Sequence, residues 1–274
     1  SDTTTADPPA TPLSADAESQ VVPLATRAEP AKPARVLAIA NQKGGVGKTT
    51  TAINLGTALA AIGEQVLILD IDPQGNASTG VGVAEAERHI TTFVILSGRA
   101  SIAQAGARTE GPNLSMVPGN AALVGLETQM LKESNRPFRL RDAITALHAD
   151  QRANPVAVPY TYLLIDCPPS LNLLTLNAMV AGEAVVGAVQ CGVFALEGIS
   201  QLKATIDQIR ATLNPALEIQ GVVLTMHDAR TQLSKEVAAE VRNFFGAKVY
   251  ETMIPRNVRI AEAPSHGKPI MLYD

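Results

Sequence analysis

The chain has 274 residues, of which 46% are hydrophobic and 18% charged, and it carries 22 basic and 26 acidic side chains. This content is enough to bury the core of one or two domains, and the formal charge of -4 argues against a protein that coats nucleic acid by bulk charge. Two cysteines, Cys167 and Cys191, are too few for a disulfide scaffold and lack the spacing of a zinc site. The sequence indicates neither a membrane span nor a signal peptide, so we expect a cytoplasmic protein that does not bind membrane.

Residues 1–34 differ in composition from the rest of the chain. They contain six prolines, eight alanines and no aromatic residue, with five acidic against two basic side chains. Such a segment lacks the apolar side chains that offset the entropy of ordering, so we expect a disordered, acidic tail. Residues 35–274 are nearly neutral, and their apolar runs alternate with helical patterns. This alternation predicts a single α/β domain.

The first apolar run, residues 36–40, predicts a buried strand, which a Gly-rich turn connects to a helix from about 49 to 61. A second strand is predicted directly afterwards, at residues 66–70. Further strands are predicted at 114–117, 162–166, 184–189 and 219–225, and further helices near 138–147, 171–180, 197–213 and 234–245. This rhythm is typical of a doubly wound, mostly parallel sheet with helices on both faces.

The most informative stretch is NQKGGVGKTT at residues 41–50, between the first strand and the first helix. Glycines let successive backbone N–H groups wrap a polyphosphate, and the start of a helix adds a positive dipole. In such a loop Lys48 contacts the β- and γ-phosphates and the Thr49 hydroxyl binds Mg²⁺. The loop residues expected to line the phosphates are Gly44, Gly45, Val46 and Gly47.

The loop departs from the strict P-loop pattern GxxxxGK[ST], because Gln42 stands where that pattern has its first glycine. An additional lysine, Lys43, stands at the start of the loop. The alternative interpretation is a Gly-rich turn that binds no ligand. The Gly-Lys-Thr sequence between a strand and a helix favours the nucleotide site.

Acidic residues end two of the predicted strands. Asp70 and Asp72 close the second strand, and Asp166 closes the strand at 162–166. Because the carboxyl ends of parallel strands face one crevice, these carboxylates are expected to reach Mg²⁺ or the attacking water. Taken singly, each aspartate fits an ordinary turn or helix cap better, and the Gly-rich loop beside them is what favours a functional role.

Together these motifs resemble the ParA/MinD group of deviant Walker ATPases, and within it the chromosome- and plasmid-partition ParA proteins. The resemblance covers about residues 35–274. It rests on five segments: NQKGGVGKTTTAINLG, DIDPQGN, LLIDCPPSL, QCGVFALEG and IPRNVRIAEAPSHGKPI. It implies a P-loop fold, ATP and Mg²⁺ as cofactors, and an ATP-dependent sandwich homodimer in which Lys43 reaches the phosphates bound by the other subunit.

The resemblance also implies roles for individual residues around the nucleotide. Asp72 orients or activates the water, Asp166 assists Mg²⁺ through a water molecule, and Thr50 contacts the α-phosphate. Pro255 and Asn257 belong to a segment near the adenine. Enzymes of this group hydrolyse ATP slowly, and a partner protein accelerates them.

Binding of double-stranded DNA without sequence specificity is a further implication, and it requires the ATP dimer. The positions concerned are Arg230, Arg256 and Arg259, which without the resemblance read as solvated surface residues. A few arginines on each of two subunits give salt-sensitive affinity despite a net acidic chain. The implied setting is the nucleoid, with a ParB-like centromere-binding partner.

The sequence departs from the usual family pattern at several positions. Ala188 and Gly192 stand where relatives usually have Pro and Glu, and Val94 stands where Asp is common. The sequence stops at Tyr273-Asp274, where relatives continue into a terminal helix. We expect the nucleotide crevice to be intact without that helix, and dimer packing or DNA affinity to be weaker.

Three functions fit these observations to different degrees. The preferred one is a DNA-partition ATPase, and the second is a similar ATPase that positions a protein cluster on the nucleoid. The third is a P-loop metabolic ligase similar to dethiobiotin synthetase. Lys43 and the segment PRNVR at residues 255–259 argue against the ligase.

Overall fold

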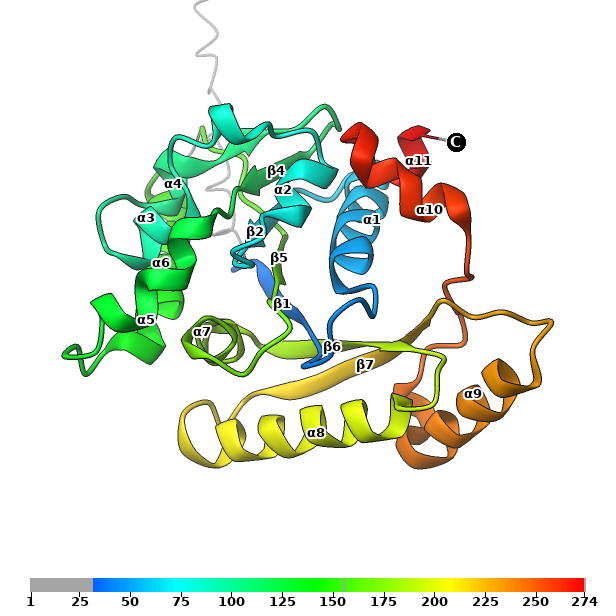
Figure 1. Cartoon of the computed structure of the whole chain (residues 1–274). Coiled ribbons are helices and arrows are strands. Elements are labelled where there is room, and N and C mark those ends of the chain that lie inside the picture. The colour runs from blue at the N-terminus through cyan, green and yellow to red at the C-terminus, as the bar shows by residue number, and fades with distance from the viewer. Residues whose placement is uncertain (1–31, 155, 274) are drawn as a thin grey trace, which may run out of the picture. The chain divides into compact units, whose positions relative to one another are not determined.

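The computed structural model describes residues 32–154 and 156–273, so most of the expected tail at residues 1–34 lies outside the described residues. Lys32 and Pro33 are exposed, whereas Ala34 is only 1% exposed and belongs to the hydrophobic core. Residues 35–273 form a seven-stranded sheet covered by helices on both faces (Figure 1). This architecture confirms the predicted fold class.

The sheet has the strand order β3-β4-β2-β5-β1-β6-β7. All neighbouring strands pair in parallel except β3 and β4, which are antiparallel. The strands are β1 (Arg35–Ala40), β2 (Val66–Asp70), β3 (Ala107–Arg108), β4 (Leu114–Val117), β5 (Tyr162–Asp166), β6 (Ala184–Gln190) and β7 (Glu218–Thr225). The six longer strands confirm the sequence prediction, whereas β3 has two residues and is too short to produce a periodic pattern.

Five long helices correspond to the predicted ones: α1 (Lys48–Ala61), α6 (Arg139–Ala153), α7 (Leu173–Ala181), α8 (Ala195–Thr212) and α9 (Gln232–Phe245). The sequence does not predict the short helices α2 (Asn76–Gly80), α3 (Thr92–Leu96), α4 (Ile102–Ala105), α5 (Leu126–Gln129), α10 (Val258–Glu262) and α11 (Ile270–Tyr273). Single 3₁₀ turns lie at Glu85–Glu87, Ala121–Gly125, Arg136–Phe138, Gly246–Lys248 and Ala263–His266.

The buried strands separate two apolar layers, because successive side chains point to opposite faces of a sheet. In β1, Val36 and Ala38 belong to the larger cluster, which includes residues of α6, α7 and α8. Leu37 belongs to a second cluster with Ile53 of α1. Figure 1 shows the same arrangement, with α1 on one side of the sheet and α7 and α8 on the other. Burial on both faces explains the continuous apolar runs of these strands.

Strand register brings the predicted site residues to one edge of the sheet. Asp70 at the end of β2 lies directly opposite Asp166 at the end of β5. On its other side, β5 pairs with β1 so that Asp166 is opposite Ile39. The Gly-rich loop leaves β1 two residues later. The loop and the acidic strand ends therefore meet at the carboxyl edge of the central strands, as predicted for a parallel sheet.

Candidate nucleotide-binding site

The Gly-rich loop has the backbone of a phosphate cradle. Gly45 and Gly47 have φ values of 69° and 86°, in the left-handed region that favours glycine. Gly47 is the N-cap of α1, and no side chain caps the helix there. The first N–H groups of α1 are therefore available to an anionic ligand, which the helix dipole also favours.

Contacts with neighbouring strands hold the loop in place. The Thr225 hydroxyl, at the end of β7, donates to the Val46 carbonyl oxygen at 2.6 Å. On the other side, Asn41 Nδ2 donates to the Ala188 carbonyl oxygen at 2.7 Å, and Asn41 Oδ1 accepts from the Lys43 N–H at 3.0 Å. Sequence reasoning does not assign Asn41, although a polar residue directly at the end of a buried strand is a usable signal. At position 188 only the backbone carbonyl oxygen takes part in this hydrogen bond, so the bond is compatible with alanine at this position.

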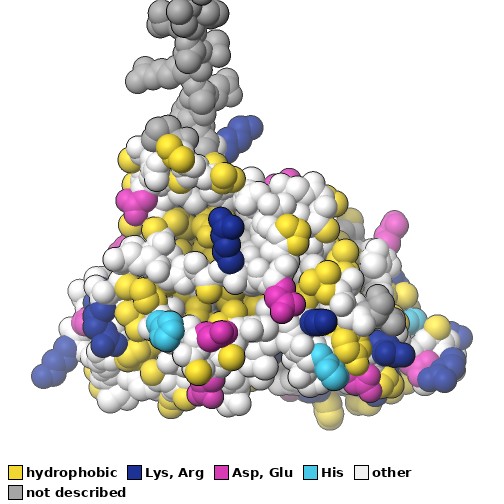
Figure 2. All heavy atoms as spheres, turned by 90° about the horizontal axis from the view of Figure 1, so that it is seen from above, with side chains coloured by type: hydrophobic (Ala, Val, Ile, Leu, Met, Phe, Trp, Pro, Cys, Tyr) yellow, Lys and Arg dark blue, Asp and Glu magenta, His cyan; other side chains and the backbone are white. Residues whose placement is uncertain are grey.

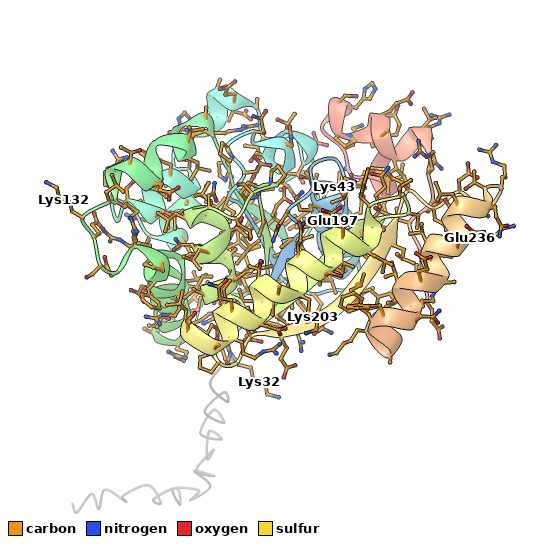
Figure 3. The ribbon with its side chains drawn as sticks, turned by 60° about the horizontal axis from the view of Figure 1, so that its bottom comes forward. Lys32, Lys43, Lys132, Glu197, Lys203 and Glu236 are labelled. Carbon is orange, nitrogen blue, oxygen red and sulfur yellow. The ribbon has the colours of Figure 1, made fainter. Side chains whose placement is uncertain are left out.

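The two lysines of the loop have different environments. Lys48 is 6% exposed, and its Nζ donates to the Lys43 carbonyl oxygen at 2.8 Å. Burial lowers the pKa of Lys48, and the nearby Asp166 opposes that effect. Lys43 is exposed, and its Nζ lies 4.6 Å from the centroid of the Phe194 ring, a cation–π distance. Figure 3 shows Lys43 at the N-terminal end of α8, where Glu197 also lies.

Asp166 and Thr49 form the part of the site that fits a magnesium ion. The Thr49 hydroxyl donates to Asp166 Oδ2 at 2.8 Å, and Asp166 is fully buried. The other carboxylate oxygen, Asp166 Oδ1, is buried without a hydrogen-bond partner among the described residues. Burial and the charge of Asp70 raise the pKa of Asp166 well above its usual range. An unpartnered carboxylate oxygen beside a threonine hydroxyl is a suitable donor set for hydrated Mg²⁺.

Asp70 and Asp72 make different contacts although they are two residues apart. Asp70 Oδ2 accepts from the Ser78 N–H at 2.9 Å and the Ser78 hydroxyl at 2.6 Å, and its Oδ1 accepts from the Asp72 N–H at 3.1 Å. Burial raises the pKa of Asp70 to about 6. Asp72 is 7% exposed, and its Oδ1 accepts from the Gln74 N–H at 3.0 Å. Asp70 thus holds the segment after β2 in place and positions Asp72 at the crevice.

The segment expected near the adenine lies beside His227, two residues after the end of β7. The His227 N–H donates to the Ile254 carbonyl oxygen at 3.0 Å, and the Arg256 N–H donates to the His227 carbonyl oxygen at 2.9 Å. Pro255 directly follows Ile254, which packs against the apolar cluster that contains Val46 of the loop. Asn257 caps α10, because its Oδ1 accepts from the Arg259 N–H at 2.7 Å.

The three arginines expected to bind DNA are all exposed. Arg230 forms a two-pronged ion pair with Asp228, with its Nε and Nη2 atoms each 2.9 Å from a carboxylate oxygen. Hydrogen bonds from Arg230, and the weaker charge effect of Arg256, lower the pKa of Asp228 to about 2. Arg230 and Arg256 therefore lie near one carboxylate, and Arg259 lies in the first turn of α10. Figure 2 shows the surface seen from above relative to Figure 1. At its right-hand end, on the side where α9 and α10 lie in Figure 1, Lys and Arg side chains are mixed with acidic and His side chains.

The remaining positions singled out in the sequence lie outside these contacts. Gly192 has open space where a Cβ would stand, and Val94 is half-buried in α3. Cys167 and Cys191 are free thiols and both are buried. Within residues 32–154 and 156–273, we find no helix whose length and hydrophobicity match a membrane crossing.

Comparisons with known proteins match these features. A family model described as an AAA domain matches residues 34–219. The chromosome partitioning protein ParA of Caulobacter vibrioides (strain NA1000 / CB15N) is 58% identical over 244 residues, which are 89% of this chain and 89% of the relative. The sporulation initiation inhibitor protein Soj of Bacillus subtilis (strain 168) is 48% identical over 240 residues, 88% of this chain and 91% of the relative. Among solved structures, cobyrinic acid a,c-diamide synthase from Mycobacterium smegmatis, with bound ATP analogue and magnesium, is 35% identical with a TM-score of 0.74, covering 82% of this chain and 86% of that chain.

Proposed function

This chain belongs to the ParA/MinD family of P-loop ATPases, and from that premise we propose that it is a switch that binds double-stranded DNA as an ATP-bound homodimer. In this proposal it drives chromosome or plasmid segregation with a ParB-like partner that stimulates slow ATP hydrolysis. The observation that carries the proposal is that buried Lys48 lies near Asp166 and Asp72 at the uncapped start of α1. A phosphate chain bound there contacts groups suited to hold it and to hydrolyse it.

The loop and its lysines bind the triphosphate in this scheme. Backbone N–H groups of residues 44–47 and of the α1 start surround the β-phosphate, and the Thr50 side chain contacts the α-phosphate. Lys48 exchanges its present acceptor, the Lys43 carbonyl oxygen, for phosphate oxygens. Exposed Lys43 is free to reach the phosphates of a second subunit, where its charge stabilises the transferring phosphoryl group.

Mg²⁺ neutralises phosphate charge when it is bound. The Thr49 hydroxyl would hold the ion, and Asp166 and Asp72 would act on it through water molecules. In this scheme Asp72 orients the attacking water, and Asp70 holds the backbone of Asp72 in place. Pro255 and Asn257 line the base, which places the adenine beside the end of β7.

DNA binding uses the exposed arginines Arg230, Arg256 and Arg259. Contacts from both subunits to the phosphate backbone give an affinity that falls steeply with salt and does not depend on sequence. The charge of -4 for the whole chain leaves this local attraction intact, since exposed charges act over about 10 Å at moderate salt. Binding of this kind places the protein at the nucleoid in the cytoplasm.

An Asp72→Asn variant tests the assignment of the hydrolytic step. We expect it to bind a fluorescent ATP analogue as the wild type does, with phosphate release reduced about 100-fold or more, since a positioned carboxylate typically contributes that much. Asp142→Asn, at an exposed aspartate of α6, is the matched control and retains wild-type turnover. Equal turnover in Asp72→Asn and the wild type contradicts the role of Asp72.

The similarity to cobyrinic acid a,c-diamide synthase favours a second candidate, an ATP-dependent ligase acting on a small molecule. Such an enzyme needs a carboxylate acceptor for full ATP turnover and does not bind DNA in a salt-sensitive manner. Turnover without any acceptor, together with DNA binding that requires ATP, excludes it. The higher identity, 58%, to the chromosome partitioning protein ParA of Caulobacter vibrioides makes the ligase the weaker candidate.

A further inference from the structure

Arg88 connects three segments that surround the Asp72 turn. This half-buried residue directly follows the 3₁₀ turn Glu85–Glu87. Its Nη1 donates to the Gly119 carbonyl oxygen at 3.1 Å, and its Nη2 donates to the Thr79 hydroxyl at 2.8 Å. The Val83 carbonyl oxygen accepts from Nε at 3.3 Å and from Nη2 at 3.1 Å. One guanidinium thus joins α2, the chain after α2 and the turn after β4.

Both ends of this connection lie against the backbone of Asp72. The Gly75 N–H donates to the Asp72 carbonyl oxygen at 2.9 Å, closing a turn that ends at the start of α2. A Cβ on Gly75 would stand 2.3 Å from Arg88 Nη1, so the guanidinium packs directly on that turn. A Cβ on Gly119 would stand 2.8 Å from the carbonyl oxygens of both Asp70 and Asp72. The turn after β4 therefore touches the chain at Asp72 itself.

A second set of hydrogen bonds closes the network. The Gly119 N–H donates to the Ser78 hydroxyl oxygen at 3.0 Å, and the Ser78 hydroxyl donates to Asp70 Oδ2 at 2.6 Å. Asp70 Oδ1 in turn accepts from the Asp72 N–H. Arg88 and Asp70 therefore hold the same segment from its two sides, and Asp72 lies between them.

We propose that Arg88 is a positioning residue for ATP hydrolysis, which keeps Asp72 in the orientation needed for the attacking water. The proposal rests on the proposed function, because Asp72 receives its role there. Arg88 acts through the Asp72 turn and the Gly119 turn, and it has no part in binding the nucleotide. A displacement of a reacting group by about 1 Å can cost about 100-fold in rate, so a loosened turn has a measurable effect.

The residue type matters because of the directions of these bonds. A guanidinium is planar and donates from several fixed positions, whereas an ammonium is a single point of charge. Lysine at position 88 keeps the charge and reaches one of the three acceptors. Methionine keeps much of the apolar length and donates no hydrogen bond. These two replacements separate the effect of charge from the effect of a three-way connection.

The test measures phosphate release, affinity for a fluorescent ATP analogue and the thermal midpoint of unfolding for Arg88→Lys and Arg88→Met. We expect kcat to fall roughly 10- to 100-fold in Arg88→Met and less in Arg88→Lys, with nucleotide affinity within about twofold of the wild type. Arg210→Met is the matched control, because Arg210 also donates to a backbone carbonyl, that of Leu217, at the amino end of β7. Normal kcat in the folded Arg88 variants overturns the proposal, as does an equal loss in Arg210→Met.

A double variant distinguishes positioning from an unrelated loss of stability. Adding Arg88→Met to Asp72→Asn causes no further fall in kcat if Arg88 acts through Asp72, and a second full loss overturns the proposal. If Arg88→Met does not fold, Thr79→Val removes the acceptor of Arg88 Nη2 together with the hydrogen bond that the Thr79 hydroxyl donates to the Gly75 carbonyl oxygen, and is expected to lower kcat by a smaller factor. Unchanged kcat in that variant counts against the proposal. A wild type without ATPase activity overturns the proposed function, whereas an active wild type with normal Arg88 variants overturns only the inference.

Discussion

Three aspartates lie at the ends of neighbouring strands: Asp70, Asp72 and Asp166. Their carboxylates differ in hydrogen bonding. Asp70 has both carboxylate oxygens occupied by Ser78 and by the Asp72 N–H, so it has a structural role. Asp166 retains a buried oxygen without a partner in the described chain, which suits a metal-bound water. Among the three, Asp72 is the carboxylate to which we assign the hydrolytic step in the proposed function.

At the residue scale, the buried Asp70 carboxyl makes stability depend on pH. Its pKa in the folded state is about 6, above the ordinary value of 3.8, so the folded chain binds more protons than the unfolded chain between these values. The contribution of Asp70 to stability is therefore largest at low pH and declines as the pH rises through 6. The Ser78 hydrogen bonds oppose the rise in pKa, because they stabilise the ionised form.

Ser78→Ala is expected to lower the free energy of unfolding by about 1 to 3 kcal/mol at pH 7.5, where Asp70 is ionised. At pH 5 the loss is smaller, because Asp70 is then protonated in the folded state. Urea unfolding at the two pH values measures the difference. Ser97→Ala is the control. Ser97 is the C-cap of α3, and its hydroxyl donates to the Phe93 carbonyl oxygen of the same helix. A Ser78→Ala penalty that is the same at both pH values contradicts this account of Asp70.

The ion pair between Arg230 and Asp228 predicts a gain of DNA affinity on removal of the carboxylate. Asp228 keeps its charge at any working pH, because its pKa is lowered to about 2, and in the proposed complex it would compete with DNA phosphates for Arg230. Since exposed pairs are weak, Asp228→Asn should tighten ATP-dependent binding to a random-sequence duplex about two- to fivefold. Asp207→Asn, which breaks a similar exposed pair with Lys203 on α8, leaves DNA binding unchanged. Weaker binding by Asp228→Asn refutes the competition.

At the element scale, two glycines of the phosphate loop provide a matched comparison. Both have positive φ, but a Cβ at Gly45 meets no atom within 4 Å, whereas a Cβ at Gly47 lies 3.3 Å from Thr225 Cγ2. Gly45→Ala is expected to cost about 1 to 2 kcal/mol from its backbone conformation alone. Gly47→Ala costs more and also weakens ATP binding, because the α1 N-terminus shifts. Urea unfolding and ATP-analogue titration test both, and equal costs for the two variants contradict the geometry.

The elements that the sequence predicts are those whose pattern is set by burial. Residues 66–70, 114–117 and 162–166 are mainly apolar because helices cover both faces of the sheet, and their observed bounds agree with the prediction. The short α2 and α3 are missed, because five residues are too few for a helical period.

Site residues within the loop motif and at strand ends can be predicted from the sequence, because a parallel sheet brings the carboxyl ends of its strands together. Arg88 and Gly119 are not, because their contact joins residues 31 positions apart and depends on tertiary packing. Asn41 and Ser78 likewise become meaningful only when their acceptors on other elements are known. The orientation of Arg230 toward Asp228 is also a matter of local side-chain geometry that no pattern encodes.

At the scale of the whole molecule, ATP is the proposed condition for DNA binding. The nucleotide crevice lies at the carboxyl edge of the central strands, and the segment 254–257 runs from the core of the phosphate loop to α10 with its arginine. We propose that this continuity couples ATP occupancy to the proposed DNA-binding face. A nearly neutral body with a few exposed arginines needs two subunits to bind a duplex firmly.

The most direct measurement is binding to a random-sequence DNA duplex with ATP, with ADP and without nucleotide, at two salt concentrations, while the oligomeric state is recorded. We expect a dimer that binds DNA only with ATP, with affinity that falls steeply at the higher salt and is lost in Arg230→Ala and Arg259→Ala. DNA binding that is equal in all three nucleotide states, or an ATP-bound dimer that binds no DNA, contradicts this expectation.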